Sequence, residues 1–417
     1  MSDYQIIVIG AGPAGLMAAG QASLLGAKTL VLEKMGRVAI KLSITGKGRC
    51  NLTNMADYSD FLSHFNPDGG FCRQAFARFF STDLIAFINK LGVPTIVERG
   101  GRVFPESGRA GEVVASILKW AGDCGVIIRK RTPASGLLVD QGYVKGVFLN
   151  DQIITADAVV IATGGVSYPA TGSTGDGYLM AESHGHYIVP IQPSLVPMET
   201  AGDIALQLSD VKLRNVGATL WIDEKKIAEA FGEVLFRPYG LAGPIILSLS
   251  RMAVKALCSN KQVYISIDLK PALSPKKLDA RLRRDLDLNG KKEFHSLLKG
   301  LLPRRLIPVC ISMTKISIHK ASHQVTSRER KRLGQWLKDF RLEIIRFRPF
   351  SEAIVTSGGV STKGIDPRTM GSRIVKGLFF AGEILDLDAD TGGFNLQWAF
   401  SSGWLAGKSA VNFLAQR

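Results

Sequence analysis

The stretch Gln5-Ile6-Ile7-Val8-Ile9-Gly10-Ala11-Gly12-Pro13-Ala14-Gly15 decides the fold. Its four consecutive apolar residues predict a buried strand, and its glycines predict a tight turn into the alanine-rich helix pattern of residues 16–25. A second apolar run at residues 29–32 predicts another strand, which ends at Glu33. This order of strand, glycine turn, helix, strand and acid predicts the start of a parallel α/β sheet.

The same spacing is typical of a dinucleotide site in a Rossmann-type fold. The first glycine, Gly10, would make the tight turn, Gly12 would let the backbone approach a pyrophosphate, and Gly15 would let the helix pack on the sheet. The helix N-terminus would offer free N–H groups to the phosphates. Glu33 is placed to bind a ribose hydroxyl pair, and its charge would repel the 2′-phosphate of NADP. The motif therefore predicts FAD or NAD.

Length and composition indicate an ordinary globular protein with more than one domain. The chain has 417 residues, 46% of them hydrophobic and 21% charged, which predicts two or three domains. No apolar run is long enough to span a membrane, and no basic leader precedes the first strand. We therefore expect a cytoplasmic protein without a membrane span.

Five cysteines and six histidines show no metal-binding or triad spacing, so we assign neither a metal ligand nor a catalytic residue from the sequence. The cysteines are odd in number, lack a C-x-x-C pair and predict reduced thiols. A flavin disulfide reductase, which needs two neighbouring cysteines, is disfavoured. For Cys50 a packing role is favoured over a redox role, because no resolving cysteine is near.

The positive charge is concentrated in one segment. The formal net charge is +16, and residues 270–348 contain 21 Lys or Arg against 7 Asp or Glu, a difference of +14. Such a segment could attract nucleic acid, an anionic membrane surface or an acidic substrate. The alternative is a solvated helical surface, because aromatic residues are sparse there and no nucleic-acid-binding motif is present.

Further along the chain, residues 41–54 are rich in glycine, hydroxyl and cationic side chains. They predict a loop, neither helix nor strand, that wraps a polar or anionic ligand with its amides. Residues 73–91 carry apolar side chains at helical spacing, and residues 109–121 predict a second helix. Residues 140–142 predict a hairpin turn, and residues 157–162 predict a central parallel strand.

Changes in composition and apolar pattern along the chain predict four segments. Residues 1–190 and 343–417 carry the α/β pattern, residues 191–270 form a β-rich insert, and residues 271–342 form a basic helical excursion that returns to the insert. Residues 377–383 predict a strand ending at Glu383, whose carboxylate could bind the hydroxyls of an extended chain such as ribitol. Residues 391–397 open a closing helix whose N–H groups would point at a developing negative charge.

Four stretches together resemble the FAD-dependent flavoproteins with two dinucleotide-binding domains. They are residues 10–15 with Glu33, residues 162–165, residues 377–383 and residues 391–397. More narrowly, Thr45-Gly46-Lys47-Gly48-Arg49-Cys50-Asn51-Leu52-Thr53-Asn54 and Thr391-Gly392-Gly393-Phe394-Asn395-Leu396-Gln397 are similar to the signatures of the BaiN-like flavoproteins, over nearly the whole chain. Phe394 stands where that family often has Tyr.

The resemblance implies an FAD domain built from both chain ends and interrupted by a β-barrel-like domain and a small helical domain. It also implies which residues contact FAD: the pyrophosphate at the glycine turn, the ribose at Glu33, the ribitol at Glu383 and the isoalloxazine at residues 393–396. The full set is Gly10, Gly12, Pro13, Ala14, Gly15, Glu33, Lys34, Lys41, Gly46, Gly48, Arg49, Cys50, Asn51, Ala134, Ala162, Thr163, Gly164, Gly382, Glu383, Gly392, Gly393, Phe394, Asn395 and Leu396.

We expect from this an FAD-dependent oxidoreductase that transfers hydride or electrons through flavin N5 to or from a small-molecule substrate. The resemblance implies either an NAD(P)H-linked reductase or a small-amine oxidase. Because only one dinucleotide fingerprint exists, NAD(P)H would act as a transient reductant at most. The alternative is a nucleic-acid-binding or RNA-modifying flavoprotein that uses the basic segment 270–348. The substrate, the electron partner and the oligomeric state stay open.

Overall fold

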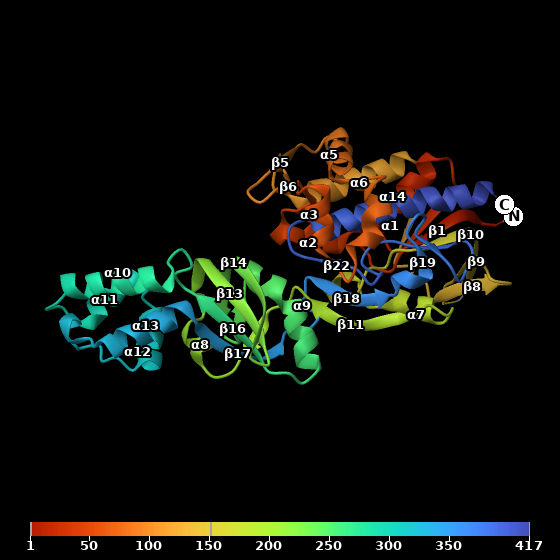
Figure 1. Cartoon of the computed structure of the whole chain (residues 1–417). Helices are drawn as coiled ribbons and strands as arrows, with labels where there is room; N and C mark the ends of the chain where they lie inside the picture. The colour runs from red at the N-terminus through yellow and green to blue at the C-terminus, as the bar shows by residue number, and fades with distance from the viewer. Residues whose placement is uncertain (1, 151, 417) are drawn as a thin grey trace. The chain divides into compact units, whose positions relative to one another are not determined.

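The computed structural model describes residues 2–150 and 152–416. It divides into two compact units: the first unit is Met1–Pro193 with Ala353–Arg417, and the second unit is Ser194–Glu352. Each unit has its own buried apolar core. In Figure 1 the red start and the blue end of the chain both belong to the first unit. The prediction that one α/β fold is assembled from both ends of the chain is therefore confirmed.

The first unit is built on a sheet with the strand order β19-β20-β21-β10-β1-β2-β7, extended by a hairpin of β8 and β9 beside β10. Strands β21, β10, β1, β2 and β7 run parallel. The bounds are β1 Tyr4–Ile9, β2 Thr29–Glu33, β7 Ile127–Lys130, β8 Gly136–Asp140, β9 Tyr143–Phe148, β10 Ile153–Ile161, β19 Ile365–Asp366, β20 Gly371–Ser372 and β21 Leu378–Phe380. The predicted hairpin and the predicted central parallel strand are confirmed.

The long helices α1 (Pro13–Leu24) and α14 (Phe394–Ala415) lie side by side (Figure 1). Small residues allow this close approach, since a Cβ at Gly403 or Gly407 would meet the backbone oxygens of Ala14 or Ala18 at 2.3 and 2.2 Å. The remaining helices of this unit are α2 Ile40–Gly48, α3 Tyr58–Ser63, α4 Arg73–Phe76, α5 Ser81–Lys90, α6 Ala110–Asp123 and α7 Asp176–Glu182.

Short strands complete the first unit. They are β3 Thr53–Asn54, β4 Phe65–Asn66, β5 Thr95–Val97, β6 Arg102–Pro105, β11 Ile188–Ser194, β18 Val355–Val360 and β22 Asp388–Ala389. Strand β22 pairs with β4, and β3 pairs with β6. The pairing of β22 with β4 ties residues 65–66 to residues 388–389, close to the C-terminus.

The second unit contains a closed antiparallel barrel with the order β12-β15-β14-β13-β16-β17. Its strands are β12 Met198–Thr200, β13 Lys212–Ile222, β14 Lys225–Arg237, β15 Gly240–Ala242, β16 Val263–Asp268 and β17 Phe340–Phe347, with helices α8 Ile204–Gln207 and α9 Pro244–Cys258. Closure leaves no unpaired sheet edge. The expected β-barrel-like insert is therefore present.

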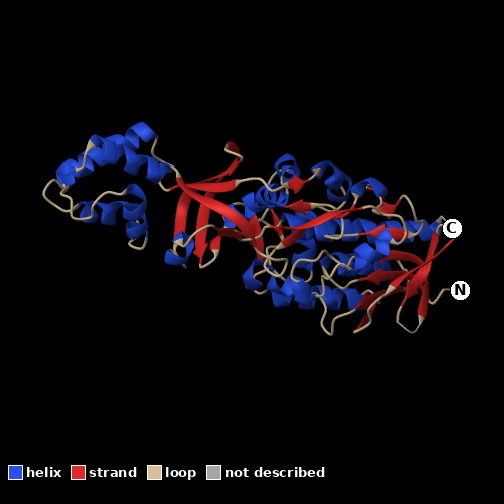
Figure 2. Cartoon of the chain, turned by 90° about the horizontal axis from the view of Figure 1, so that it is seen from below, coloured by secondary structure: helices blue, strands red, loops and turns tan. Residues whose placement is uncertain are grey.

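Four further helices follow β16 and return the chain to β17. They are α10 Pro275–Leu288, α11 Phe294–Leu301, α12 Leu306–Thr314 and α13 Ser327–Lys338. Figure 2 shows them as a group of blue helices separate from the red barrel strands. Their apolar faces, including Leu282, Phe294 and Leu333, are buried in the core of the second unit. No described helix in either unit is long and apolar enough to cross a membrane.

Two sequence-based predictions about local structure are wrong. The segment 41–54, expected to be a loop, begins inside helix α2, although Thr45, Gly46 and Lys47 leave the helical conformation and kink it. The helix expected over residues 73–91 is broken into α4 and α5. The apolar spacing of residues 73–91 was correct, but it did not reveal the break. Tertiary packing, together with the Asp83 carboxylate that caps α5 at the Phe80 N–H, decides where each helix ends.

Candidate functional site

The predicted cofactor segments come together at the carboxyl ends of the parallel strands, which we call the carboxyl edge. The Gly10 N–H donates to the carbonyl oxygen of Leu32, and the Ala162 N–H donates to that of Ile9, at 2.8 and 2.9 Å. The Ala381 N–H donates to the Ile161 carbonyl at 3.0 Å. The ends of β2, β1, β10 and β21 are therefore adjacent, at the place where open α/β sheets bind ligands.

The three glycines of the first turn have three different surroundings. Gly10 has φ +101°, and a Cβ there would lie 2.6 Å from the carbonyl oxygen of Ala162. A Cβ at Gly15 would lie 1.9 Å from the Gly10 oxygen, whereas a Cβ at Gly12 would have no atom within 4 Å. Only Gly12 faces open space. A ligand can therefore approach the backbone at the N-terminus of α1, which begins at Pro13 without a side-chain cap.

Glu33 is anchored beside this turn. Its carboxylate oxygens accept hydrogen bonds from the N–H groups of Ala11 at 2.9 Å and Met35 at 2.8 Å. The Thr132 N–H donates to the Glu33 carbonyl at 2.9 Å, which brings the buried Ala134 segment close to Glu33. Next along the chain, Lys34 forms an ion pair with Asp176 at 2.6 Å.

Residues 49–51, which directly follow the kinked helix α2, lie in three different environments. Arg49 pairs with Glu98, and its guanidinium carbon lies 4.3 Å from the centroid of the Phe104 ring. Cys50 is fully buried, and this burial raises the pKa of its thiol to about 12. Asn51 has a buried side-chain oxygen with no hydrogen-bond partner among the described residues. A neutral thiol suits packing better than nucleophilic or redox chemistry.

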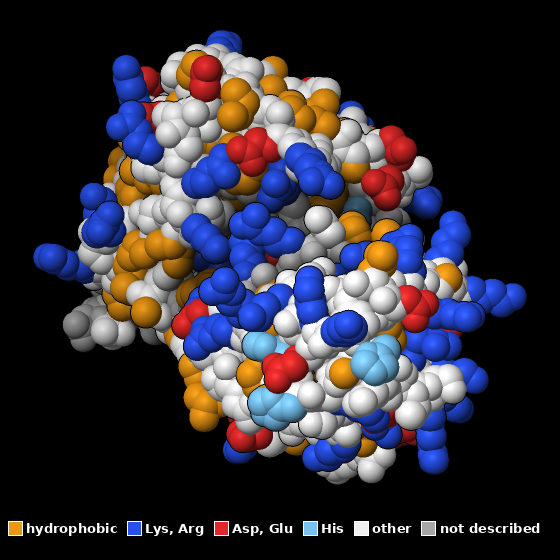
Figure 3. All heavy atoms as spheres, turned by 90° about the vertical axis from the view of Figure 1, so that its left-hand side faces the viewer, with side chains coloured by type: hydrophobic (Ala, Val, Ile, Leu, Met, Phe, Trp, Pro, Cys, Tyr) orange, Lys and Arg blue, Asp and Glu red, His pale blue; other side chains and the backbone are white. Residues whose placement is uncertain are grey.

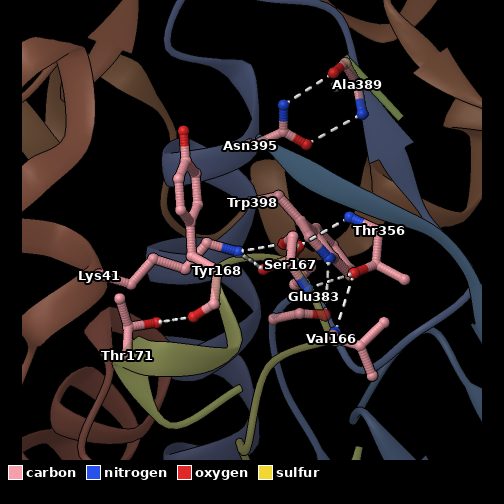
Figure 4. A network of polar contacts seen from close by, with 11 residues as sticks. Lys41, Val166, Ser167, Tyr168, Thr171, Thr356, Glu383, Ala389, Asn395 and Trp398 are labelled. Carbon is pink, nitrogen blue, oxygen red and sulfur yellow. Dashed lines mark hydrogen bonds and ion pairs between the residues drawn. The ribbon is translucent and has the colours of Figure 1, made fainter. Parts of the chain in front are cut away.

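Lys41 and Glu383 form the centre of a polar network, shown in Figure 4. The Lys41 ammonium lies 2.6 Å from Glu383 Oε2 and donates to the Ser167 hydroxyl at 2.6 Å. Glu383 Oε1 accepts from the Ser167 hydroxyl at 2.8 Å and from the Thr356 N–H at 2.9 Å. Gly164 borders the network, since its Cβ position is 4.0 Å from Glu383 Oε2. The network fixes one cation and one anion at the carboxyl edge.

The start of helix α14 contacts the signature segment that ends at Asn54. A Cβ at Gly393 would lie 2.4 Å from the Thr53 oxygen, and the Asn54 amide donates to the Gly392 oxygen at 3.0 Å. Gly382 lies next to the glycine turn, since its Cβ position is 2.9 Å from the Ala14 Cβ. The two signature stretches therefore meet at one place, although some 340 residues separate them in sequence.

Two side chains at the start of α14 are already engaged within the protein. Figure 4 shows the Asn395 amide bonded to the backbone of Ala389, through its oxygen at 2.9 Å and its nitrogen at 2.7 Å. The buried Phe394 ring packs against Phe61 and stacks on His64, with centroid distances of 4.8 and 4.0 Å. What residues 393–396 can offer a ligand is therefore mainly their backbone N–H groups and the half-buried Leu396 side chain.

The structure adds residues that the sequence did not single out. His64 Nδ1 lies 2.9 Å from Asp390 Oδ2, and Ser167 and Thr356 hold Glu383 as described above. The Tyr178 hydroxyl is buried without a described partner, and its pKa is raised by burial and by the nearby Glu383 charge. No regular spacing links these residues, so only the strand pairing of the fold could have revealed them.

The residues present fit FAD. The open space at Gly12 suits a pyrophosphate, and Glu33 lies beside that turn where a ribose would follow. Two buried oxygens on the predicted cofactor segments, Asn51 Oδ1 and Thr163 Oγ1, have no partner within the described chain. Buried polar atoms are normally hydrogen-bonded, so unpaired ones on these segments are consistent with a polar ligand.

Comparison with known proteins assigns the family. The family model described as "HI0933-like protein Rossmann domain" matches residues 4–409. This chain belongs to that family. A 3-dehydro-bile acid delta(4,6)-reductase of Clostridium scindens is 30% identical over 410 residues, covering 98% of this chain and 99% of the relative. The resemblance to BaiN-like flavoproteins is thereby confirmed.

Two further similarities extend the comparison of this HI0933-like chain. A ribosomal RNA dihydrouridine synthase of Escherichia coli is 28% identical over 412 residues, covering 99% of both chains. The open conformation of a flavocytochrome c3 fumarate reductase superposes with a TM-score of 0.51 at 18% identity, covering 98% of this chain and 78% of that one. At that identity the superposition shows a shared fold alone.

Proposed function

We propose that this chain is an FAD-dependent oxidoreductase that saturates an electron-poor C=C bond of a small organic substrate. The observation that carries the proposal is the meeting of the glycine turn, the Lys41–Glu383 network and the α14 start at the carboxyl edge. When bound, FAD would supply hydride or electron transfer through its N5 position. The reductase name of the Clostridium relative supports the reductive direction over the oxidation of a small amine.

The protein's own residues would bind and orient the cofactor. Gly12 and the N-terminus of α1 would take the pyrophosphate, and Glu33 the ribose. Glu383 and Lys41, held by Ser167 and the Thr356 N–H, would present fixed charges to the polar chain of the cofactor. NAD(P)H would reduce the protein transiently, because the carboxyl edge has one dinucleotide fingerprint, which FAD would occupy.

The test measures cofactor content before activity. We would compare wild type with Gly12→Val, whose side chain enters the open space meant for the pyrophosphate. The matched control is Gly111→Val on α6, where a Cβ likewise has no atom within 4 Å. We expect the FAD released by acid from Gly12→Val to fall at least roughly tenfold, with the control unchanged and both variants folded. Full FAD retention in Gly12→Val would overturn the assignment of the cofactor to this turn.

Anaerobic addition of NADH, then NADPH, to the FAD-loaded protein gives the reaction class. Bleaching of the flavin absorbance by either nucleotide is the result we expect for a nicotinamide-linked reductase. Reoxidation by an electron-poor alkene would then identify the substrate class. An unbleached flavin that a small amine reduces directly would contradict the reductase assignment.

A second candidate function is the reduction of uridine in RNA. Uridine and dihydrouridine differ by two hydrogens across one conjugated C=C bond, so this reaction is of the same class. Two observations favour it: the +14 charge of residues 270–348 and the rRNA dihydrouridine synthase relative, whose length this chain matches. Incubation of reduced enzyme with unmodified rRNA fragments, followed by mass measurement, would show a gain of about 2 Da per modified uridine.

A further inference from the structure

Helices α10 and α13 of the second unit enclose a groove of about 1290 Å³, which we call the basic groove. The helices are joined by a two-bond contact from Arg330 to Asp279, at 2.8 and 3.3 Å. They approach closely at Gly334, whose Cβ position is 3.7 Å from Leu282. Most leucines of both helices are buried in the core, and the groove is lined by charged residues together with apolar side chains such as Leu288, Met313 and Trp336.

The cations of the basic groove are largely unneutralised. Six Lys or Arg line it against three Asp: Lys276, Arg283, Arg284, Lys331, Arg332 and Lys338, with Asp279, Asp287 and Asp339. Arg284 pairs with Asp285, and Lys338 pairs with Asp268. The other four cations form no ion pair within the described residues.

Arg332 provides an observation of a different kind. Its Nε atom is buried and has no hydrogen-bond partner within residues 2–150 and 152–416. A buried guanidinium N–H without an acceptor costs free energy, so it is normally satisfied by some oxygen atom. Arg332 is also one of the residues that line the groove.

Figure 3 looks onto the side of the molecule that lies at the left of Figure 1, where the labels of α10–α13 stand. Lys and Arg side chains are far more numerous on this surface than Asp and Glu. Neighbouring like charges repel each other and weaken the folded state. A polyanion with regularly spaced charges would relieve that repulsion by replacing small counterions.

We propose that the basic groove binds the phosphodiester backbone of structured RNA. This deepens the second candidate function and rests on it for RNA as the polyanion. A membrane surface fits less well, because a helix that lies on a bilayer needs an apolar face directed toward the lipid. Three of the four leucines of α10, which are Leu278, Leu282 and Leu286, are instead buried in the core of the second unit, and Leu288 is the exposed one.

The experiment measures binding of the FAD-loaded full chain to a fluorescent RNA hairpin of about 16 base pairs, at several KCl concentrations. The groove variant is Arg283→Gln with Lys331→Gln, two exposed groove cations without ion pairs. The matched control is Lys299→Gln with Arg304→Gln, which removes the same charge from exposed positions that do not line the groove.

We expect the groove variant to bind on the order of tenfold more weakly at about 0.1 M salt, and its slope of log K against log salt to be reduced by roughly two. The control should stay within about twofold of wild type. Equal losses in both variants would overturn the groove as the site, since affinity would then follow net charge alone. Equal binding of DNA of the same sequence would overturn the specificity for RNA.

Two further measurements separate this inference from the proposed function. Phosphatidylserine vesicles are tested with the same variants, and vesicle binding that depends on Arg283 and Lys331 while RNA binding does not would overturn the proposal. FAD content and flavin reduction by NADH are measured on every preparation. A groove variant that keeps both but loses RNA binding supports the groove alone. A hairpin that binds in the groove but gains no mass supports the groove and rejects the uridine reaction.

Discussion

At the carboxyl edge, the Lys41 ammonium lies 2.6 Å from the Glu383 carboxylate, which also accepts hydrogen bonds from Ser167 and Thr356. In the basic groove, Arg283 and Lys331 form no ion pair among the described residues, although the charge of Asp279 is close enough to interact with both. The first region fixes its charges internally, as a site does when it must hold one cofactor in one pose. In the second region the cations stay available to bind an external polyanion in place of small counterions. The two regions should therefore respond differently to mutation, pH and salt.

The largest effect is expected where the carboxyl edge depends on backbone packing. In Gly15→Ala the new Cβ would lie 1.9 Å from the Gly10 oxygen, so helix α1 must shift from β1. We expect destabilisation by about 3 kcal/mol or more, seen as a Tm lower by roughly 6–12 °C in thermal unfolding. Gly12→Ala should leave the Tm of FAD-free protein unchanged. Similar Tm losses in both would mean that Gly12 also serves packing.

A smaller loss is expected from the Lys41–Glu383 pair, whose side chains are 21% and 20% exposed. Glu383→Ala leaves the Lys41 ammonium without its carboxylate, and we expect a cost of about 2 kcal/mol, less than for a fully buried pair. Lys41→Met should cost about 1 kcal/mol, because Glu383 keeps Ser167 and the Thr356 N–H.

Urea unfolding of FAD-free protein measures both changes. The double variant Lys41→Met with Glu383→Ala should reveal a coupling free energy of about 1 kcal/mol. Strictly additive single and double effects would show that the pair contributes no mutual stabilisation. The carboxyl edge would then not differ from the basic groove in this respect.

A third test uses the pH dependence of stability in the first unit. His186 in the first unit is buried, and this burial, with the nearby His184, lowers its pKa to about 4. Because the unfolded chain protonates near pH 6.5, the unfolded state binds the extra proton between these values. The His186 contribution to stability is therefore complete above about pH 6.5 and is lost as the pH falls toward about 4.

The measurement is the free energy of unfolding against pH for wild type and His186→Gln. His186→Gln should flatten the slope between about pH 6.5 and 4, whatever its absolute stability. An unchanged slope would assign the acid sensitivity to other groups.

The sequence predicted the backbone of the carboxyl edge but not its side-chain network. Glycine spacing reports backbone constraints between near neighbours, and the different surroundings of Gly10, Gly12 and Gly15 follow the roles expected from that spacing. Ser167 and Thr356 reach Glu383 through strand pairing over long separations, which leaves no local pattern. The contact between His64 and Asp390 could not be predicted for the same reason, because the two residues lie far apart in sequence.

In the second unit the sequence predicted a charge excess and helices but not a groove. The basic groove exists because α10 and α13, some fifty residues apart, meet at Gly334 and through the Asp279–Arg330 pair. Helical periodicity predicts which face of each helix is buried, but it does not predict which helices are neighbours. The helix break at residues 77–80 was missed for a related reason, because packing decides where a helix with continuous apolar spacing ends. The helix at residues 40–48 was missed because its glycines and hydroxyl side chains predicted a loop.

The smallest effect, and the one that sharpens the comparison most, concerns Asp279 at the basic groove. Arg330 lowers the pKa of this carboxyl group by hydrogen bonding, so the ion pair contributes stability above the usual carboxyl range and loses it as the pH falls below that range. Asp279 is 44% exposed, so Asp279→Asn should cost only about 0.5–1 kcal/mol at low salt, and less at high salt. The same change removes a negative charge from the groove and frees Arg330, so RNA affinity should rise about threefold.

The control is Glu343→Gln, at an exposed position of β17 without an ion pair in the described chain, which should change neither the free energy of unfolding nor the RNA affinity. Opposite signs for stability and RNA affinity are expected only if the groove favours an external anion over its own carboxylates. Equal affinity changes in the two variants would instead mean that RNA senses net charge alone.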